Sequence, residues 1–245
     1  MIYDVTGSEI DVGISAAKAA IHRGEVICLP TDTVYGIGAD PFNADAITAL
    51  LTAKSRTRQM PPPVLVPNWE TATEIAAWIN PKAQLLAEKY WPGALTLIFP
   101  AKENLGWDLG ETHGTVALRM PDHPAALTLL QISGPLAVTS ANITGQPPAT
   151  QVSAAVRALG EKVSVYLDGG PSRTGVPSTI LKFDPETPDS AEVIREGALP
   201  AAQLLAAVGL QLKNNAAPAK TQKLVRSEKP SVAGAANSAE SAQRQ

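Results

Sequence analysis

The chain has 245 residues, of which 44% are hydrophobic and 18% are charged, so it can form one large domain or two small ones around a buried core. Its single cysteine, Cys28, excludes an internal disulfide, and its three histidines lie far apart in sequence, so no metal-binding motif is evident. The net charge of −3 combines an acidic body with a basic C-terminal stretch, and an acidic body argues against a general nucleic-acid-binding protein.

Apolar periodicity and capping residues predict the helices. A stripe of apolar residues from Ile10 to Ile21 predicts the first helix, which Gly24 ends. Asn43 is a suitable N-cap for the second helix, and Lys54 lies in its last turn, where a positive charge interacts favourably with the helix dipole. Further helices are expected at residues 68–79, 81–91, 123–132, 151–159 and 200–207.

Short runs of apolar and β-branched residues predict the strands. They occur at residues 25–30, 63–66, 94–99, 115–120, 136–140, 163–168, 178–183 and 191–196. Some of these runs stand singly between helices, and others are adjacent pairs. This arrangement favours an α/β fold with a mixed sheet covered by helices over a strict βαβ repeat.

The two ends of the chain differ from the rest. The N-terminal residues include acidic side chains and no long apolar run, so we expect neither a signal peptide nor a membrane span, and a cytoplasmic location. Residues 211–245 contain six basic and two acidic residues and almost no large apolar ones. We expect a folded domain over residues 1–210, followed by a disordered basic tail; a loose contact of that tail with RNA is a weaker alternative.

Polar residues gather where predicted strands end. In "LPTDTVYGIGAD", residues 29–40, a strand is followed by Thr31, Asp32, Thr33 and Tyr35. In "LAVTSANITG", residues 136–145, a strand ends in Thr139, Ser140 and Asn142. Small donors at a strand end can hold a phosphate or carboxylate; taken alone, residues 29–40 are more typical of a hydrogen-bonded turn, and a turn is the alternative for residues 136–145 as well.

The stretch "AKSRTRQMPPPVLVP", residues 53–67, places three basic residues beside three prolines. The helix dipole accounts for Lys54 but not for Arg56 and Arg58, whose planar guanidinium groups suit a phosphate or carboxylate. A solvated loop is an equally good interpretation of this stretch alone. Arg119 and Arg195 each end an apolar strand, and together with the stretch at 54–58 they indicate a site for a polyanion.

Taken together, these stretches resemble the YrdC family of threonylcarbamoyl-adenylate synthases. The resemblance covers roughly residues 9–207 and rests on ordered motifs: "PTDTVYGIGAD", Lys54-x-Arg56, "WPGALTLI", "TVALRMPDHP", "TSANITG", "GVPSTI" and "VIREG". It implies a three-layer fold with a concave basic pocket. It also implies a reaction in which L-threonine, bicarbonate or CO₂, and ATP give threonylcarbamoyl-AMP and pyrophosphate. A separate transferase machinery would then use the product to modify an adenosine next to the anticodon of tRNA.

The resemblance also implies roles for individual residues. ATP would be bound by Arg56, Thr115, Ser140 and Arg195. L-threonine would be bound by Thr33, Tyr35, Arg119 and Ser178. Catalysis would rest on Lys54, Arg56, Ser140 and Asn142. Mg²⁺ would accompany ATP, held by phosphates and water, with no metal site in the protein itself.

The chain departs from the commonest family pattern at three positions. Ser55 and Thr57 replace a Gly and a Pro, and Leu65 stands where many relatives carry a histidine, so we expect the threonine pocket to be arranged differently on that side. Two other functions fit the same fold: a carbamoyl-phosphate-handling or other nucleotide-dependent enzyme, and a non-catalytic RNA-binding or regulatory module. The acidic body and the 4% aromatic content disfavour the RNA-binding module.

Overall fold

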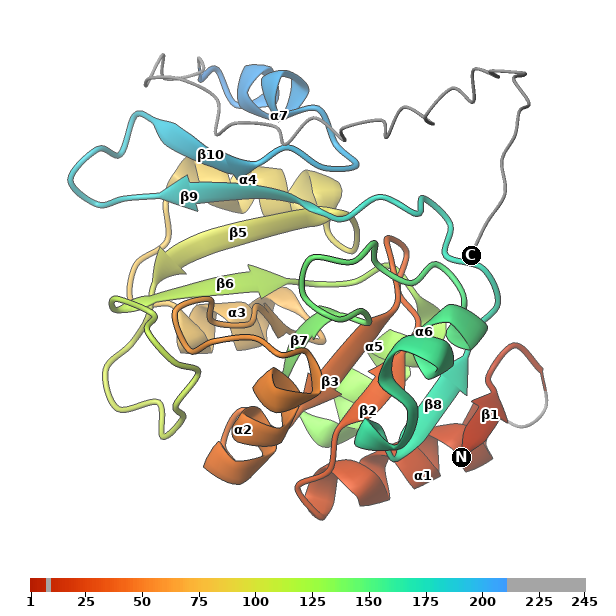
Figure 1. Ribbon diagram of the computed structural model, residues 1–245. Helices are drawn as coiled ribbons and strands as arrows, with labels where there is room; N and C mark the ends of the chain where they lie inside the picture. The colour runs from red at the N-terminus through yellow and green to blue at the C-terminus, as the bar shows by residue number, and fades with distance from the viewer. Residues whose placement is uncertain (8–9, 211–245) are drawn as a thin grey trace, which may run out of the picture. The chain divides into compact units, whose positions relative to one another are not determined.

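The computed structural model describes residues 1–7 and 10–210. In this part of the chain, ten strands form one mixed sheet in the order β1-β8-β2-β3-β7-β4-β6-β5-β9-β10, with helices on both of its faces (Figure 1). The strands are β1 (Ile2–Asp4), β2 (Ile27–Leu29), β3 (Gly36–Ala39), β4 (Val64–Leu65), β5 (Leu95–Pro100), β6 (Thr115–Arg119), β7 (Leu136–Ser140), β8 (Val165–Asp168), β9 (Thr179–Phe183) and β10 (Ala191–Arg195). The predicted α/β class with a mixed sheet is therefore confirmed.

Seven α-helices accompany the sheet in the described residues. They are α1 (Ile10–His22), α2 (Ala44–Ala53), α3 (Trp69–Ile75), α4 (Pro81–Tyr90), α5 (Pro124–Ser133), α6 (Val152–Leu159) and α7 (Ala201–Ala207). The predicted cap of the second helix is confirmed, because the side chain of Asn43 accepts hydrogen bonds from the backbone N–H groups of Asp45 and Ala46. No helix in the described residues is long and apolar enough to cross a membrane.

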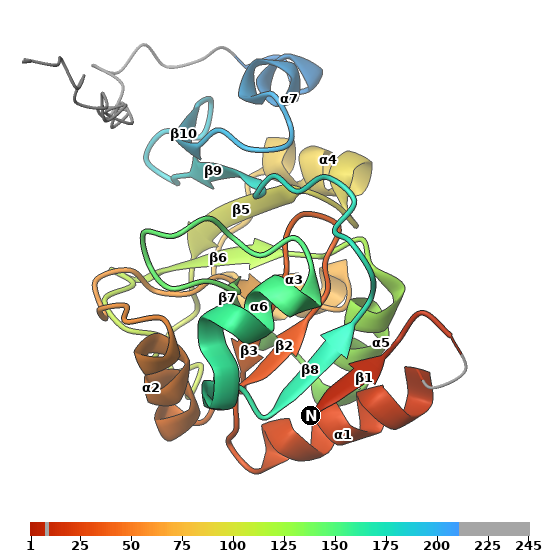
Figure 2. The same cartoon turned by 45° about the vertical axis from the view of Figure 1, so that its right-hand side comes forward.

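The helices bury the sheet in two separate hydrophobic clusters. Apolar residues of α1 and α5 pack on one face, against side chains such as Ile27 and Leu29 of β2. Helices α2, α3, α4, α6 and α7 contribute to a larger cluster that contains Cys28 of the same strand. Since successive side chains of a strand point to opposite faces, β2 divides its residues between the two clusters. Figure 2 shows α1 lying beneath β1 and β8, at the end of the sheet away from β9 and β10.

Two strands were missed in the sequence. Strand β1 is a three-residue edge strand, too short to give a periodic signal. Strand β3 contains two glycines and was interpreted as a turn. A Cβ atom at Gly36 would lie only 2.6 Å from Cγ1 of Val138 on the neighbouring strand β7, so this strand needs glycine for close approach rather than for a turn.

Two further details complete the comparison with the sequence. The helix expected at 68–79 ends at Ile75, and Ala76 instead pairs with Ala101 in an isolated bridge. The tail expected at 211–245 lies outside the described residues, so its disorder and the domain boundary stay predictions.

Candidate active site

A cavity of about 330 Å³ lies where β3, β7, β4, β6, β5 and β9 meet the loops that follow or precede them. Three arginines line it: Arg56 from the loop after α2, Arg119 at the end of β6, and Arg195 at the end of β10. None of the residues that line this cavity is acidic or a histidine. The cavity therefore combines a net positive lining with partial exclusion of water, which strengthens its attraction for an anionic ligand.

Strand alternation provides the apolar floor of this cavity. On β5, Leu95, Leu97 and Phe99 belong to the larger hydrophobic cluster, whereas Thr96 and Ile98 line the cavity. Residues Ala117 of β6, Ile180 of β9, Leu65 of β4 and Val138 of β7 add to the same floor. Helix α1 packs against β1, β8 and β2, and the smaller hydrophobic cluster that it shares with α5 also includes Leu65 and Val138 of this floor. A cavity lined by both apolar and basic side chains suits a ligand that has both an apolar ring and phosphates.

Arg56 forms one wall of the cavity. Its Nη1 donates to Oγ1 of Thr139 at 2.7 Å, and its Nη2 donates to the carbonyl oxygen of Pro61 at 3.2 Å. Its buried Nε has no hydrogen-bond partner among the described residues. Burial lowers the pKa of Arg56, and the positive charge of Arg195 lowers it further, which places the two guanidinium groups in one electrostatic environment. Arg56 thus keeps donor capacity for a ligand.

Lys54 lies behind Ser140 and not on the cavity surface. Its ammonium group donates to the carbonyl oxygens of Ser140 and Asn142, to Oγ of Ser140 at 3.3 Å and to Oδ1 of Asn142 at 3.0 Å. Lys54 is 3% exposed, and Asn142 is 7% exposed. Burial lowers the pKa of Lys54 to about 8, and the charge of Arg56 acts in the same direction. In this structure Lys54 and Asn142 shape the turn that presents Ser140, and neither is among the residues that line the cavity.

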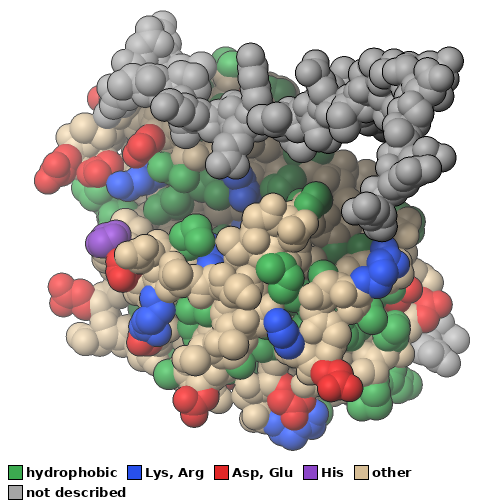
Figure 3. All heavy atoms as spheres, in the orientation of Figure 1, with side chains coloured by type: hydrophobic (Ala, Val, Ile, Leu, Met, Phe, Trp, Pro, Cys, Tyr) green, Lys and Arg blue, Asp and Glu red, His purple; other side chains and the backbone are tan. Residues whose placement is uncertain are grey.

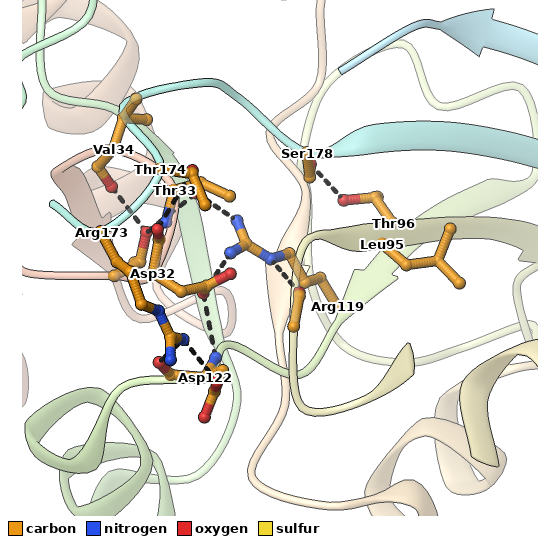
Figure 4. Close-up of polar contacts among 12 residues, drawn as sticks. Asp32, Thr33, Val34, Leu95, Thr96, Arg119, Asp122, Arg173, Thr174 and Ser178 are labelled. Carbon is orange, nitrogen blue, oxygen red and sulfur yellow. Dashed lines mark hydrogen bonds and ion pairs between the residues drawn. The ribbon is translucent and has the colours of Figure 1, made fainter. Parts of the chain in front are cut away.

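Arg119 is held in a buried ion pair with Asp32 (Figure 4). Its Nη1 donates to Oγ1 of Thr33 at 2.9 Å, and its Nε donates to the carbonyl oxygen of Gly93 at 2.9 Å. Asp32 is 3% exposed and Arg119 is 7% exposed. Burial lowers the pKa of Arg119, while the carboxylate of Asp32 acts in the opposite direction. Three of the five N–H donors of this guanidinium are therefore engaged, and two are left for a ligand in the cavity.

Ser178 and Arg195 form the opposite wall. Nε and Nη2 of Arg195 donate to the carbonyl oxygen of Ser178 at 3.0 and 2.8 Å, and Oγ of Ser178 lies 2.7 Å from Oγ1 of Thr96 (Figure 4). Partial burial lowers the pKa of Arg195, and the positive charge of Arg119 lowers it further. Arg195 as a whole is still an exposed residue, so the effect of burial on it is modest. Since the carbonyl fixes one edge of the guanidinium, its other N–H groups stay available at the rim of the cavity.

The hydroxyl groups of two predicted site residues, Tyr35 and Thr115, bond to backbone groups of the protein itself. The ring of Tyr35 is fully buried, and its hydroxyl group donates to the carbonyl oxygen of Gly170 at 2.6 Å and accepts from the N–H of Gly169 at 3.0 Å. Its hydroxyl therefore anchors the loop after β8. Oγ1 of Thr115 donates to the carbonyl oxygen of Thr112 at 2.8 Å, and both threonines line the cavity.

A loop between β5 and β6 closes one side of the cavity. Arg58 forms an exposed ion pair with Asp108, and its carbonyl oxygen accepts from the N–H of Glu111 at 2.9 Å. Leu109 of the same loop is 3% exposed and lines the cavity. Arg58, the third charge of the basic stretch, is thus engaged in holding this loop.

The structure brings the predicted site residues together around one cavity. Thr33, Tyr35, Arg56, Thr115, Arg119, Ser140, Ser178 and Arg195 all line it, and Lys54 and Asn142 lie directly behind Ser140. Three residues of the site were not predicted as individual contacts: Thr96, which pairs with Ser178, Thr139, which accepts from Arg56, and Asp32, which pairs with Arg119. Thr139 and Asp32 lie inside stretches that were singled out; Thr96 is an alternate residue of an apolar strand and gives no signal in the sequence.

A second, smaller cavity of about 250 Å³ lies beside Thr31 and Asp32, bordered by His123 and by the loop from Gly169 to Arg173. The described residues contain no group of three or more His, Cys, Asp or Glu side chains that could hold a metal ion. The lining of the larger cavity also lacks carboxylates, which Mg²⁺ prefers as protein ligands. The residues present therefore do not fit a metal site built by the protein.

The protein is thus an α/β protein in which the charged side chains that line the larger cavity are the three arginines Arg56, Arg119 and Arg195. The Sua5/YciO/YrdC family model, described as "Telomere recombination", matches residues 19–197. This protein belongs to that family. The predicted membership is thereby confirmed.

Relatives with assigned names extend the comparison. The chain is 37% identical over 210 residues to the threonylcarbamoyl-AMP synthase of Bacillus subtilis. The aligned region covers 84% of this chain and 60% of that protein. The chain is 38% identical over 168 residues to the threonylcarbamoyl-AMP synthase of Coxiella burnetii, covering 67% of this chain and 90% of that protein. Identity reaches 46% over 198 residues, 81% of this chain and 90% of the relative, for a Mycobacterium tuberculosis protein whose name gives the same activity provisionally.

Solved structures agree with this family. The chain superimposes on Sua5 of Pyrococcus abyssi complexed with L-threonine with a TM-score of 0.77 at 31% identity, covering 86% of this chain and 62% of that one. Escherichia coli YciO matches with a TM-score of 0.74 at 20% identity, over 84% of this chain and 99% of that one, and this likeness concerns the fold alone.

Proposed function

We propose that this protein is a threonylcarbamoyl-AMP synthase. The carbamate formed from the amino group of L-threonine and CO₂ or bicarbonate attacks the α-phosphorus of ATP; a P–O bond forms, the bond to the β-phosphate oxygen breaks, and pyrophosphate leaves. The observation that carries the proposal is the cavity itself, in which Arg56, Arg119 and Arg195 converge and no acidic side chain lines the wall. The names of the relatives and the threonine-bound neighbour support the same activity.

The ATP side of the cavity is assigned to Arg56, Ser140, Thr115 and Arg195. Arg56 and Arg195 have no carboxylate partner among the described residues, so their charge is available to phosphates. The apolar floor beside them suits the adenine ring. Ser140, fixed by Lys54 and Asn142, offers a hydroxyl group at the end of β7.

The threonine side is assigned to Thr33, Arg119 and Ser178. The two free donors of Arg119 suit the carboxylate of the amino acid, the hydroxyl group of Thr33 accepts a hydrogen bond from Arg119, and Ser178 also lines the cavity. The earlier assignment of Tyr35 to threonine is revised to a supporting role, because its hydroxyl group is engaged with the loop after β8. Leu65, which pairs with Arg119 in the sheet register, gives this side an apolar surface.

Charge compensation and positioning are the main contributions of the protein to this reaction. Both reactants are anionic, and no histidine or carboxylate lines the cavity to transfer a proton. Mg²⁺ that arrives with ATP would be held by phosphate and water oxygens. We place the reaction in the cytoplasm, where its product would pass to a transferase that modifies adenosine in tRNA.

A non-catalytic RNA-binding module is the weaker alternative. On the face shown in Figure 3, the visible basic side chains are interspersed with acidic ones and form no broad basic region. A general RNA-binding surface would require such a region. The three arginines that line one cavity favour a small-molecule reaction instead.

One assay tests the proposal. Purified protein is incubated with ATP, L-threonine and bicarbonate, and pyrophosphate is measured. Release that requires both threonine and bicarbonate is the expected result. Release with ATP alone would indicate a different nucleotide-dependent enzyme, and no release together with tight RNA binding would favour the module.

A further inference from the structure

Asp32 connects three parts of the chain that are distant in sequence: its own loop, residues 119–122, and Thr174. Its carboxylate accepts from Nη2 of Arg119 on β6 and, at 3.0 Å, from the backbone N–H of Asp122 in the loop that leads to α5. Its backbone carbonyl oxygen accepts from the N–H and the hydroxyl group of Thr174 at 3.0 and 3.2 Å. Figure 4 shows these contacts converging on Asp32 from both sides.

One of these segments carries Ser178 into the cavity. We call residues 169–178, which join β8 to β9, the strap. None of its residues from Gly169 to Pro177 is buried, so hydrophobic packing contributes little to its position. Polar contacts hold it instead: Thr174 to Asp32, the N–H of Ser172 to the carbonyl oxygen of Thr150 at 2.8 Å, and an exposed ion pair between Arg173 and Asp122.

The charges form a continuous series from the cavity to the surface. Arg119 pairs with Asp32, Asp32 binds the backbone of Asp122, and the side chain of Asp122 pairs with Arg173 on the strap. The side chain of Arg173 is 63% exposed, whereas that of Asp32 is 3% exposed. A change at the exposed end can therefore be made without disturbing the core.

We propose that Asp32 is a positioning residue that fixes the Arg119 guanidinium and the Ser178-bearing strap relative to each other, so that the amino-acid side of the cavity is assembled as one unit. The proposal rests on the function proposed above and adds a determinant of threonine affinity. Asp32 acts through Arg119 and the strap and does not itself touch the reactants. Of the residues assigned to ATP, Arg56 and Ser140 have no hydrogen bond with this series, whereas Arg195 donates to the carbonyl oxygen of Ser178 at the end of the strap.

Kinetics of two variants test the proposal. Asp32→Asn keeps the size of the side chain but removes its charge. We expect the KM for L-threonine to rise roughly 10- to 100-fold, which is the loss typical of a charge-assisted hydrogen bond. The KM for ATP should stay within about two-fold of the wild-type value. Arg173→Ala weakens only the surface anchor, and we expect the KM for threonine to rise roughly two- to five-fold. Arg23→Ala, which removes a comparably exposed ion pair with Glu25, is the matched control and should change neither constant.

The double variant adds a second criterion. If both residues act through the strap, the effects of Asp32→Asn and Arg173→Ala on the KM for threonine will not be additive. Equal losses in both KM values and in kcat would show that Asp32 only maintains the fold, and would overturn the proposal. An unchanged KM for threonine in Arg173→Ala would overturn it even if Asp32→Asn fails to fold. An inactive wild-type protein would instead refute the proposed function, and with it this inference.

Discussion

The ammonium group of Lys54 lies 3.0 Å from Oδ1 of Asn142 and 2.8 Å from its carbonyl oxygen, although the two residues are 88 positions apart. Both were expected to contact the reacting groups directly. The structure places them one layer behind Ser140, where a buried cation satisfies several oxygens of one turn. The signature Lys54-x-Arg56 thus has two parts: the lysine shapes the site, and the arginine faces it.

The first prediction concerns the pH dependence of activity. Since the pKa of Lys54 is lowered to about 8, its proton is lost as the pH rises through that value, and the brace on Ser140 weakens. We expect kcat/KM for ATP to fall above pH 8 in the wild-type protein. The Lys54→Arg variant should keep a flat profile between pH 7 and about 10, because arginine stays charged there. A decline with the same midpoint in both proteins would assign the titration to another group.

The same pKa has a consequence for stability, with a definite sign. The folded-state pKa of about 8 lies below the ordinary lysine value of 10.5, so unfolding takes up a proton between these two values. The contribution of this group to the free energy of unfolding therefore rises with pH across that window. Denaturant titrations at pH 7.5 and 9.5 should show that this rise is absent in Lys54→Met.

A second prediction concerns Arg56. The Arg56→Ala variant should lose on the order of 100-fold or more in kcat/KM, because a fork of donors towards the phosphates is removed. Its free energy of unfolding should change by only about 1 kcal/mol, since the side chain is half-buried and bonded to Thr139 and Pro61 alone. Pyrophosphate release and thermal unfolding measure the two effects. Arg157→Ala, at an exposed position of α6, is the control and should resemble the wild type; full activity in Arg56→Ala would contradict the assignment.

A third prediction concerns the close approach of β3 and β7. An added methyl group at Gly36 would lie 2.6 Å from Cγ1 of Val138, so Gly36→Ala should destabilise the protein by about 1–3 kcal/mol. Val138→Ala should cost about 1–2 kcal/mol through the space that it leaves. The double variant should lose less free energy of unfolding than the two single variants together, because the new methyl group fills the space that Val138→Ala leaves. Chemical denaturation of the four proteins tests this; additive losses would show that the two side chains do not compete.

A fourth prediction concerns the loop over the cavity. Arg58 and Asp108 are both about half-exposed, so Arg58→Ala should lower the free energy of unfolding by less than about 1 kcal/mol. If the pair instead serves to hold the loop that carries Leu109, the KM for ATP should rise roughly two- to five-fold with kcat unchanged. Arg58→Lys should recover part of this loss. If the KM for ATP is the same in the wild type, Arg58→Ala and Arg58→Lys, the ion pair has no role in ATP binding.

Much of the fold followed from local pattern. The cap at Asn43 and the apolar stripe of the first helix, which buries Ile14, Ala17 and Ile21, act within a few residues, so the sequence shows them directly. Strand β3 did not follow, because the reason for its glycines is a valine about 100 positions away. Two glycines close together in sequence are typical of a turn, whereas here Gly36 and Gly38 allow β3 to lie close to Val138 of β7.

The sequence by itself determined the residue types of the site and their family. It supplied the arginines, the hydroxyl groups at strand ends and the ordered motifs that place the chain among the YrdC-like proteins. Only the tertiary structure decided which donors are free. Lys54 is satisfied by a turn, Arg119 is paired with Asp32, and Arg56 has no carboxylate partner among the residues that the structure describes. The reason is physical: the availability of a charge depends on burial and on partners that the fold brings from 80 to 90 positions away, and spacing along the chain does not encode these.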